Sequence, residues 1–411
     1  MGSEWVPGPF GLNAVKGTTL RGQRTVLAVA HHLTAGTRLA EVLPLLESDR
    51  RIQVAYTAAP TSVNTGGLKD FLQGLGGLVM PWEQAIHTRF DLAIAANHGM
   101  LERLHAPVMT FPHGTGPGKR YVRVHGDGPP AARPVAGVQR ERLIVGGRVV
   151  PSSLVLPHER QLRLLERECP EVLPVALVAG DPCLDRLDES RRHRDAYRRA
   201  LGAEPGRRLL FISSTWGPGS LFAQDPGVMF RVAAELDGDE YRVVAALHPN
   251  IWGWSSRRQI TRWNSDCLRM GVRLLPPEEG WLAALIAADR ILGDHGSVTY
   301  YGAAIGVPVL LGAFPEDDVV PGSHIARLGT IAPRVDWDRP LGPQLDEAVH
   351  AYNTDVHTGL HADLSSKPGR SAEILRREMY RLMRLPEPED LARLDPVPLP
   401  CPIRHGGLEA A

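Results

Sequence analysis

Short apolar segments alternate with amphipathic segments along most of this 411-residue chain. The first apolar segment, 24–30 (RTVLAVA), is followed over 37–48 by a pattern in which leucine and valine recur at a spacing of about 3.6 residues, as on one face of a helix. Parallel strands need long crossover connections, which are usually helices. This order therefore predicts βαβ units and an α/β fold with parallel sheets.

The alternation falls into two series, which the charged helical segment 188–202 separates. The expected strands of the first series are 24–30, 52–57, 77–81, 91–96 and 107–111, and those of the second are 207–215, 241–249, 272–277, 290–294 and 307–312. We expect one domain over 20–180 and another over 181–369. Residues 370–411 then supply a helix near 370–384 and an irregular, proline-rich tail.

Composition narrows the class of protein. The 46 basic and 46 acidic residues leave a formal net charge of +0, so nucleic-acid binding is not expected. The cysteines at 169, 183, 267 and 401 lack metal-ligand spacing and are typical of free thiols in a reducing compartment. No apolar run is long enough for a membrane span, and the N-terminal segment lacks the apolar core of a signal peptide. We expect a cytoplasmic protein; contact with a membrane surface and the oligomeric state stay open.

The loop 111–120 (FPHGTGPGKR) directly follows an expected strand. Its glycines allow tight bends and exposed backbone N–H groups, and its cations can face a negative charge. His113 is a candidate catalytic residue. The candidates for phosphate binding are Gly114, Thr115 and Lys119, with Arg120 as an alternative cation; the competing interpretation is a solvated turn.

Polar residues lie at the carboxyl ends of three expected strands of the second series, at Ser214–Thr215, at His248 and at 294–297. His248 is the second candidate catalytic residue. Ser297 is the expected N-cap of a helix whose first N–H groups and dipole favour an anion. The candidates for nucleotide or phosphate binding are Ser214, Thr215, Asp294, His295, Gly296 and Ser297. Each stretch alone fits an ordinary turn, but their joint occurrence at strand exits favours a binding site.

In this order, the stretches resemble the motifs of the CDP-glycerol glycerophosphotransferase family, a GT-B-fold group that includes teichoic-acid polymerases. FPHGTGPGK resembles the family's HGT-x-x-K, VAGDPCLDRL (178–187) its G-x-P-R-x-D, and LLFISSTWGPGS (209–220) its strand that ends in P-T-W. LHP (247–249) stands where the family has HP, and GDHGSVTYYGAAIGVPVLL (293–311) resembles D-Y-S-S-x-x-x-D-x-x-x-x-x-x-P. The resemblance covers about half of the chain, from 111 to 311.

The chain also departs from these motifs. The spacing from His113 to Lys119 is one residue longer, and Cys183 stands where the family has arginine. Asp294-His295-Gly296-Ser297 replaces D-Y-S-S, and Tyr301 stands near the place of the family's second aspartate. The last stretch also resembles the D-S-G-G motif of non-hydrolysing UDP-N-acetylglucosamine 2-epimerases, but SVTYYGAA (297–304) lacks their carboxylate.

The resemblance implies a GT-B-like enzyme with two Rossmann-like domains that face a central crevice, and a C-terminal helix that returns to the first domain. It implies transfer of a glycerophosphate or glycosyl group from a nucleotide-diphosphate donor to an acceptor hydroxyl. His113 would act as general base and His248 would donate a hydrogen bond to a phosphate. Lys119 would offset phosphate charge in place of a metal, so no metal or other cofactor is expected. The alternatives are an epimerase-like enzyme and a non-catalytic binding module.

Overall fold

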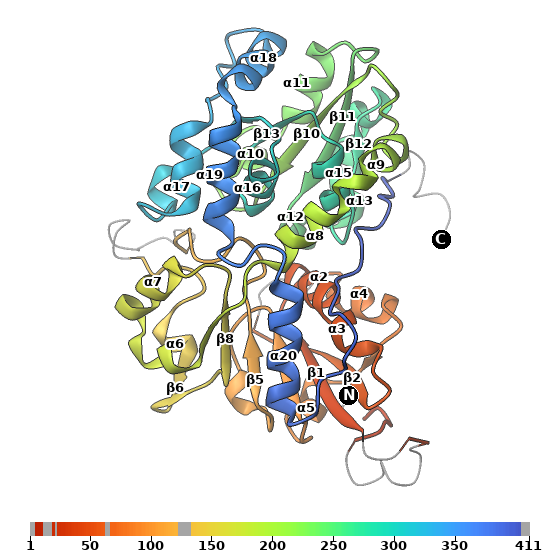
Figure 1. Ribbon diagram of the computed structural model, residues 1–411. Helices are drawn as coiled ribbons and strands as arrows, with labels where there is room; N and C mark the ends of the chain where they lie inside the picture. Colours follow the sequence, from red (N-terminus) through yellow and green to blue (C-terminus); the bar gives the residue numbers. More distant parts are fainter. Residues whose placement is uncertain (1–4, 11–18, 21–22, 62–65, 122–132, 404–411) are drawn as a thin grey trace. The chain divides into compact units, whose positions relative to one another are not determined.

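The computed structural model describes residues 5–10, 19–20, 23–61, 66–121 and 133–403, and the chain divides into two compact units (Figure 1). Unit 1 comprises Met1–Gly116, Gly137–Asp185 and Ser365–Asp395, and unit 2 comprises Pro117–Ala136, Arg186–Leu364 and Pro396–Ala411. The segment Pro117–Ala136 thus belongs to unit 2, whereas the sequence predicts it as part of the first domain, 20–180. The reason is a set of backbone hydrogen bonds to unit 2, described below with the site.

Unit 1 is built on a seven-stranded sheet with the order β3-β2-β1-β4-β5-β8-β9, and every pair in it is parallel. Its strands are β1 (Arg24–Ala30), β2 (Ile52–Ala58), β3 (Leu78–Val79), β4 (Leu92–Ala95), β5 (Val108–Thr110), β8 (Ser153–Leu156) and β9 (Ala176–Val178). Residues of β4 are buried on both faces of the sheet, as in other parallel sheets covered by helices. A separate antiparallel pair joins β6 (Ile144–Val145) to β7 (Arg148–Val149).

The helices of unit 1 are α2 (Leu33–Val42), α3 (Pro44–Glu47), α4 (Leu68–Gly74), α5 (Trp82–Ala85), α6 (Arg140–Leu143), α7 (Arg160–Glu168) and α20 (Ser371–Met383). Short 3-10 turns lie at η1 (Leu101–Arg103) and η3 (Pro170–Val175). The helix α8 (Pro182–Ser190) begins in unit 1 and ends in unit 2.

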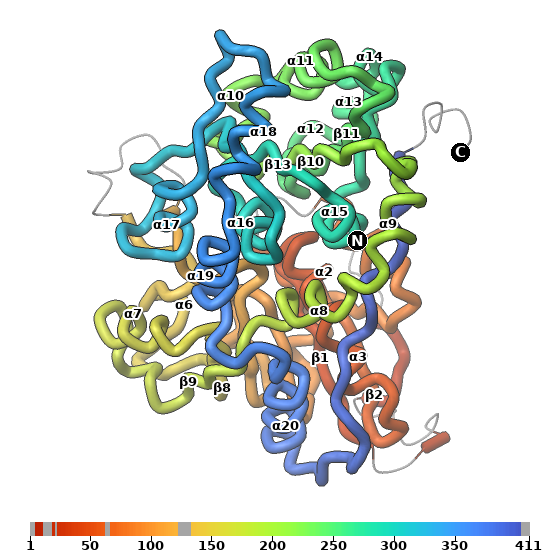
Figure 2. The backbone as a smooth tube through the Cα atoms, turned by 45° about the horizontal axis from the view of Figure 1, so that its top comes forward, coloured from red at the N-terminus to blue at the C-terminus, as the bar shows by residue number. Residues whose placement is uncertain are grey.

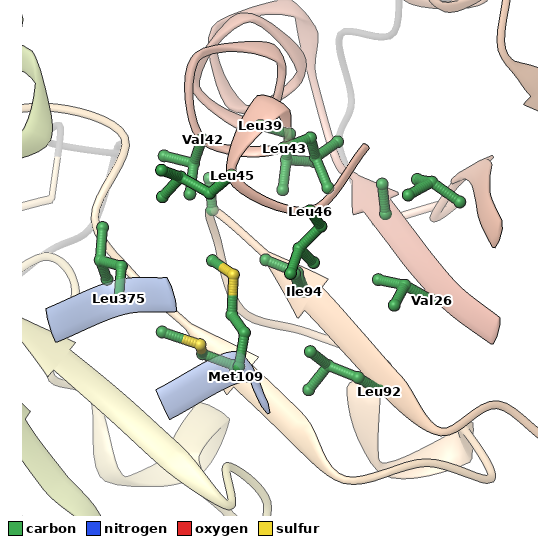
Figure 3. Packing of buried hydrophobic residues seen from close by; sticks show 14 of the residues in the cluster. Val26, Leu39, Val42, Leu43, Leu45, Leu46, Leu92, Ile94, Met109 and Leu375 are labelled. Carbon is green, nitrogen blue, oxygen red and sulfur yellow. The ribbon is translucent and has the colours of Figure 1, made fainter. Parts of the chain in front are cut away.

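Both ends of the chain contribute to the core of unit 1. Leu46 of α3, Met109 of β5 and Leu375 of α20 belong to one cluster of fully buried side chains (Figure 3). In the tube view, α20 lies beside α3 (Figure 2), and the Tyr380 hydroxyl donates to the Asp49 carboxylate over 2.8 Å. The helix expected near 370–384 is therefore an integral part of unit 1.

Unit 2 is built on a five-stranded sheet with the order β12-β11-β10-β13-β14, again with every pair parallel. Its strands are β10 (Arg208–Ser214), β11 (Tyr241–Leu247), β12 (Arg273–Leu274), β13 (Arg290–Gly293) and β14 (Val309–Leu311). Its helices are α9 (Arg194–Ala200), α10 (Leu221–Gln224), α11 (Val228–Glu235), α12 (Pro249–Ser255), α13 (Arg257–Trp263), α14 (Ser265–Arg269), α15 (Trp281–Ala287), α16 (Ser297–Ala304), α17 (His324–Ile331), α18 (Leu341–Ala351) and α19 (Thr354–Leu364), with 3-10 turns η4 (Arg191–His193) and η5 (Glu316–Asp318).

The C-terminal segment after Asp395 packs against unit 2. The Tyr197 hydroxyl donates to the Val397 carbonyl over 2.6 Å, and the Val397 amide donates to the Ser190 hydroxyl over 3.0 Å. Farther along, the Ile403 amide donates to the Leu274 carbonyl over 2.9 Å. The segment is irregular, as expected, but its backbone is anchored through residue 403. None of the helices in the described ranges combines the length and apolar character that a membrane crossing requires.

Truncation of Leu375 tests the role of α20 in the core. Leu375→Ala should lower the free energy of unfolding by about 2–5 kcal/mol, because it removes a fully buried side chain and leaves a cavity. Leu391→Ala, at a position that is 73% exposed in the same unit, should change it by less than about 0.5 kcal/mol. Urea denaturation of both variants provides the comparison; equal losses would show that α20 does not contribute to the core in this way.

Candidate functional site

The polar residues predicted in unit 2 lie at one edge of its sheet. Ser214 and Thr215 end or follow β10, His248 follows β11, and the stretch 294–297 follows β13. Because β11, β10 and β13 are neighbours and parallel, their carboxyl ends lie at the same edge. The structure therefore brings these residues together, as the sequence predicted.

Asp294 connects the loops at this edge. Its fully buried carboxylate accepts hydrogen bonds from the backbone N–H groups of Thr215 (2.8 Å), Leu221 (2.9 Å) and Gly296 (2.9 Å). The Ser214 hydroxyl lies 3.3 Å from the same carboxylate. Burial raises the pKa of Asp294, while these N–H donors and the nearby Lys119 lower it. The carboxylate is committed to protein donors, so we assign Asp294 to shaping the loop and not to contacting a ligand.

The start of α16 provides backbone donors. Its N-cap is Gly296, one residue before the expected Ser297, and no side chain caps it. A Cβ at Gly296 would lie 2.9 Å from the Asp294 carboxylate and 3.1 Å from Thr215 Cβ, so a side chain is disfavoured there. A helix N-terminus without a side-chain cap carries N–H groups and a partial positive charge that suit an anion.

Lys119 belongs to the segment Pro117–Ala136 and lies near Asp294 at the same edge of the sheet. The segment pairs with unit 2 through the Val320 amide to the Gly118 carbonyl (3.0 Å) and the Arg120 amide to the Asp318 carbonyl (2.8 Å). Burial lowers the pKa of Lys119, and the charges of Asp294 and Asp318 oppose that shift. Its ammonium forms no ion pair with a carboxylate in the part of the chain that the structure describes. Lys119 therefore places a buried cation near the start of α16, with the charges of Asp294 and Asp318 close to it but without a direct ion pair among the described residues.

Arg120, the alternative cation, is tied into its own loop. Its guanidinium donates to the Arg133 carbonyl over 2.8 Å, and Arg133 in turn pairs with Asp318 over 2.8 Å. Glu316 and Asp317 of η5 are exposed. Across the described residues, no group of three or more His, Cys, Asp or Glu side chains is arranged to hold a metal ion.

The two histidines at this edge of unit 2 differ in their hydrogen bonds. His248 is the N-cap of α12, where its Nδ1 accepts from the Asn250 amide over 3.1 Å. A neutral His248 ring therefore carries its proton on Nε2 and can donate from there. His295 is buried, its Nδ1 has no hydrogen-bond partner among the described residues, and burial followed by the charge of Lys119 lowers its pKa to about 3.

His113 lies in unit 1, at the exit of β5. Its Nδ1 lies 2.8 Å from the Ala96 carbonyl, and its ring packs edge-on against His32 with centroids 4.7 Å apart. A carbonyl oxygen only accepts, so Nδ1 carries the proton and Nε2 the lone pair of the neutral ring. Gly114 and Thr115 follow in unit 1, whereas Lys119 lies in unit 2. The predicted motif is thus divided between the two units.

The structure reveals histidines near His113 that the sequence analysis missed: His31 and His32 after β1, and His98 after β4. They follow apolar runs just as His113 and His248 do, so the same signal was present in VAHHL and AANHG. Burial lowers the pKa of His31 and of His98 to about 4 each. Nearby, a small pocket in unit 1 is lined by Pro112, Gly114 and other residues: Arg38, Phe111, Val155, Pro157, Gly180, Asp181, Pro182 and Leu375.

No family model and no curated protein matches the chain. Solved structures do. A variant of the wall teichoic acid polymerase TagF, soaked with CDPG, is similar with a TM-score of 0.57 and 14% sequence identity, over 89% of each chain. UDP-GlcNAc 2-epimerase from Neisseria meningitidis, bound to UDP-GlcNAc, is similar with a TM-score of 0.51 and 13% identity over 87% of this chain and 100% of its own. S. aureus MnaA with UDP gives a TM-score of 0.52 and 12% identity over 90% of this chain and 100% of its own.

At these identities the similarity establishes the fold. The expected α/β, GT-B-like fold with two parallel sheets is confirmed. The resemblance to teichoic-acid polymerases, drawn from short motifs, is matched by a likeness that extends over most of the chain. The crevice between two domains stays a prediction, as do the roles of the site residues.

Asp294→Asn tests the assignment of this residue to the architecture of the loop. An amide offers one acceptor oxygen where the carboxylate offers two, so at least one buried N–H group loses its partner. We expect unfolding to become easier by about 1–3 kcal/mol. Asp317→Asn, at an exposed position of η5, is the matched control and should leave thermal stability nearly unchanged. If the two variants melt together, Asp294 does not hold the loops.

The buried histidines of unit 1 predict acid sensitivity. An unfolded histidine takes up a proton near pH 6.5, but folded His31 and His98 do so near pH 4. The free energy of unfolding should therefore be highest above pH 6.5, fall as the pH drops towards 4, and change little below that pH. Each histidine should contribute at most about 3 kcal/mol to the loss.

Urea denaturation at several pH values measures this slope. His98→Gln should flatten the profile, whereas His87→Gln, at an exposed position of the same unit, should leave it unchanged. Parallel profiles for wild type and His98→Gln would contradict the assignment of the acid sensitivity to His98.

Proposed function

We propose that the protein is a transferase that moves a glycerophosphate or glycosyl group from a nucleotide-diphosphate donor to an acceptor hydroxyl. The observation that carries the proposal is the position of Lys119, which forms no ion pair among the described residues, near the start of α16, which no side chain caps. The fold shared with TagF and with two enzymes crystallised with UDP-GlcNAc or UDP supports a donor of this class.

Unit 2 supplies the donor site in this proposal. The N–H groups of the first turn of α16, from Ser297 onward, bind the diphosphate, aided by the helix dipole, because the Gly296 N–H already donates to Asp294. The Nε2–H group of His248 donates to a phosphate oxygen, since its Nδ1 already accepts from Asn250. Lys119 offsets the charge that develops on the leaving phosphate, a role that a metal ion fills in other transferases. The hydroxyl of Ser214 accepts from the Phe222 amide over 2.9 Å, so Ser214 shapes the pocket wall and Thr215 is the nearer candidate for ligand contact.

Unit 1 supplies the base. With Nδ1–H of His113 donating to Ala96, Nε2 is the nitrogen that accepts the proton of the acceptor hydroxyl. As that proton moves to Nε2, the acceptor oxygen forms a bond to the donor phosphorus and the bond to the nucleoside monophosphate breaks. For a glycosyl donor the new bond is to the anomeric carbon, and a nucleoside diphosphate leaves. Edge-on packing by His32 holds the ring of the base in place.

An epimerase on the same fold is the second candidate, because two of the similar structures are a UDP-GlcNAc 2-epimerase and MnaA with UDP. The segment Ser297–Ala304 counts against it, since this helix contains no carboxylate. A non-catalytic binding module would keep the anion site but would not need the His113 base.

A nucleotide panel tests the donor site. CDP, UDP, GDP, ADP and their monophosphates are added to the wild type, and thermal stability is measured. A ligand present at 100 times its dissociation constant should add about 2.7 kcal/mol of stability. Ser297→Ala and His248→Ala should reduce this shift. Thr330→Ala removes a hydroxyl that bonds only to its own helix, at the Arg327 carbonyl (2.8 Å), and is the control.

The outcomes separate the proposals. His113→Ala should keep the nucleotide shift, because His113 lies in the other unit, and should lower turnover of CDP-glycerol or a nucleotide sugar by about 10²–10⁴-fold. Full activity of His113→Ala would remove the base from the mechanism. No shift with any nucleotide would overturn the donor site and with it the proposed function.

A further inference from the structure

His295 carries a buried ring nitrogen without a hydrogen-bond partner among the described residues, directly before the start of α16. The residue is 6% exposed, it directly precedes the N-cap of α16, and its ring packs edge-on against Phe314 with centroids 6.4 Å apart. Its Nδ1 has no hydrogen-bond partner among the described residues. Buried polar atoms in folded proteins are almost always paired, so an unpaired one at a helix start needs an explanation.

Neither neutral form of the ring finds a partner for Nδ1 among the residues that the structure describes. If the proton is on Nε2, then Nδ1 is a buried lone pair without a donor; if the proton is on Nδ1, it is a buried N–H group without an acceptor. A phosphate oxygen only accepts, so a bound phosphate would satisfy the second form. A doubly protonated ring would bring two donors and a positive charge to the same ligand.

The surroundings of His295 keep the ring neutral when no anion is bound. Lys119 is the nearby cation, Asp294 in the same loop is committed to backbone N–H groups, and Asp318 acts on Lys119 from η5. His324 of α17 lies against Gly118, where a Cβ would come within 2.7 Å of its ring. Burial and the repulsion from Lys119 hold the pKa of His295 at about 3. An imidazolium at this place therefore needs a negative charge to arrive with the ligand.

We propose that His295 takes up a proton when a nucleotide-diphosphate donor binds, and holds the diphosphate as an imidazolium together with Lys119 and the start of α16. This inference rests on the proposed function and adds to it that donor binding is coupled to one proton. The proton comes from solvent, forms a bond to an imidazole nitrogen, and returns to solvent when the product leaves. No other bond is made or broken in this step.

The electrostatics favour the coupling. A donor ester brings two negative charges, and charges within about 4 Å in a partly buried site change a pKa by several units. His295 would be neutral in the free site and protonated in the bound site. Between the pKa of His295 in the free protein and its pKa in the complex, the affinity for the donor should therefore fall by up to tenfold for each unit by which the pH rises. The number of protons taken up per donor bound should approach one near pH 6.

Isothermal titration calorimetry measures the proton number directly. CDP-glycerol and UDP-N-acetylglucosamine are the probes, because their phosphates are esterified and carry no proton that titrates near neutrality. Titrations at pH 6 in two buffers with different ionisation enthalpies give the protons taken up per donor bound. We expect a value near one for the wild type and near zero for His295→Gln, whose dissociation constant should rise by about tenfold or more at pH 6.

Two further variants make the outcomes decisive. His295→Tyr introduces the residue of the resembling D-Y-S-S motif, which has no proton to gain near pH 6, and should bind without proton uptake. His324→Gln removes a neighbouring histidine and should keep the proton number of the wild type. Binding without proton uptake by the wild type, or uptake that persists in both His295 variants, would overturn the inference and leave the donor site intact. Failure of the wild type to bind either donor would overturn the proposed function itself.

Discussion

The buried carboxylate of Asp294 is the interaction on which the edge of unit 2 depends. It collects backbone N–H groups from the exit of β10, the start of α10 and the start of α16. A charged acceptor in a dry environment forms strong hydrogen bonds and would be costly to leave unpaired, so these loops are fixed relative to one another. The backbone donors at the start of α16, which we propose bind the donor phosphates, are thus set in place by a residue that does not need to face the ligand.

The chain passes from one unit to the other within the stretch that the sequence singled out. His113 is anchored in unit 1 by the Ala96 carbonyl, whereas Lys119 is anchored in unit 2 through backbone bonds of Gly118 and Arg120 to 318–320. Gly118 is needed here because the His324 ring occupies the place of a Cβ. The proposed base and the proposed donor-site cation are therefore encoded a few residues apart, and each is held by its own unit.

Periodicity was enough to predict the parallel sheets, because buried parallel strands are apolar throughout and differ clearly from amphipathic helices. Strand exits then indicated the edge that carries His248 and Asp294. The sequence could not show that Asp294 points into the protein, that Pro117–Ala136 leaves unit 1, or that Val397 is anchored to Ser190. Those facts depend on contacts between residues far apart in the chain, which leave no local pattern.

The departure from D-Y-S-S becomes intelligible when Gly296 and His295 are considered together. A serine at 296 would bring a side chain to within 2.9 Å of the Asp294 carboxylate, so glycine relieves a steric conflict but removes a hydroxyl donor. The loss of that donor leaves the backbone N–H groups, Lys119 and the His295 ring to meet an anion. Hydroxyl donors bind a phosphate at any pH near neutrality, whereas an imidazole does so most strongly when it is charged. In the proposed donor site, the substitution would thus replace a contact that is insensitive to pH with one that is sensitive to it, at a position where the surrounding loops are already fixed.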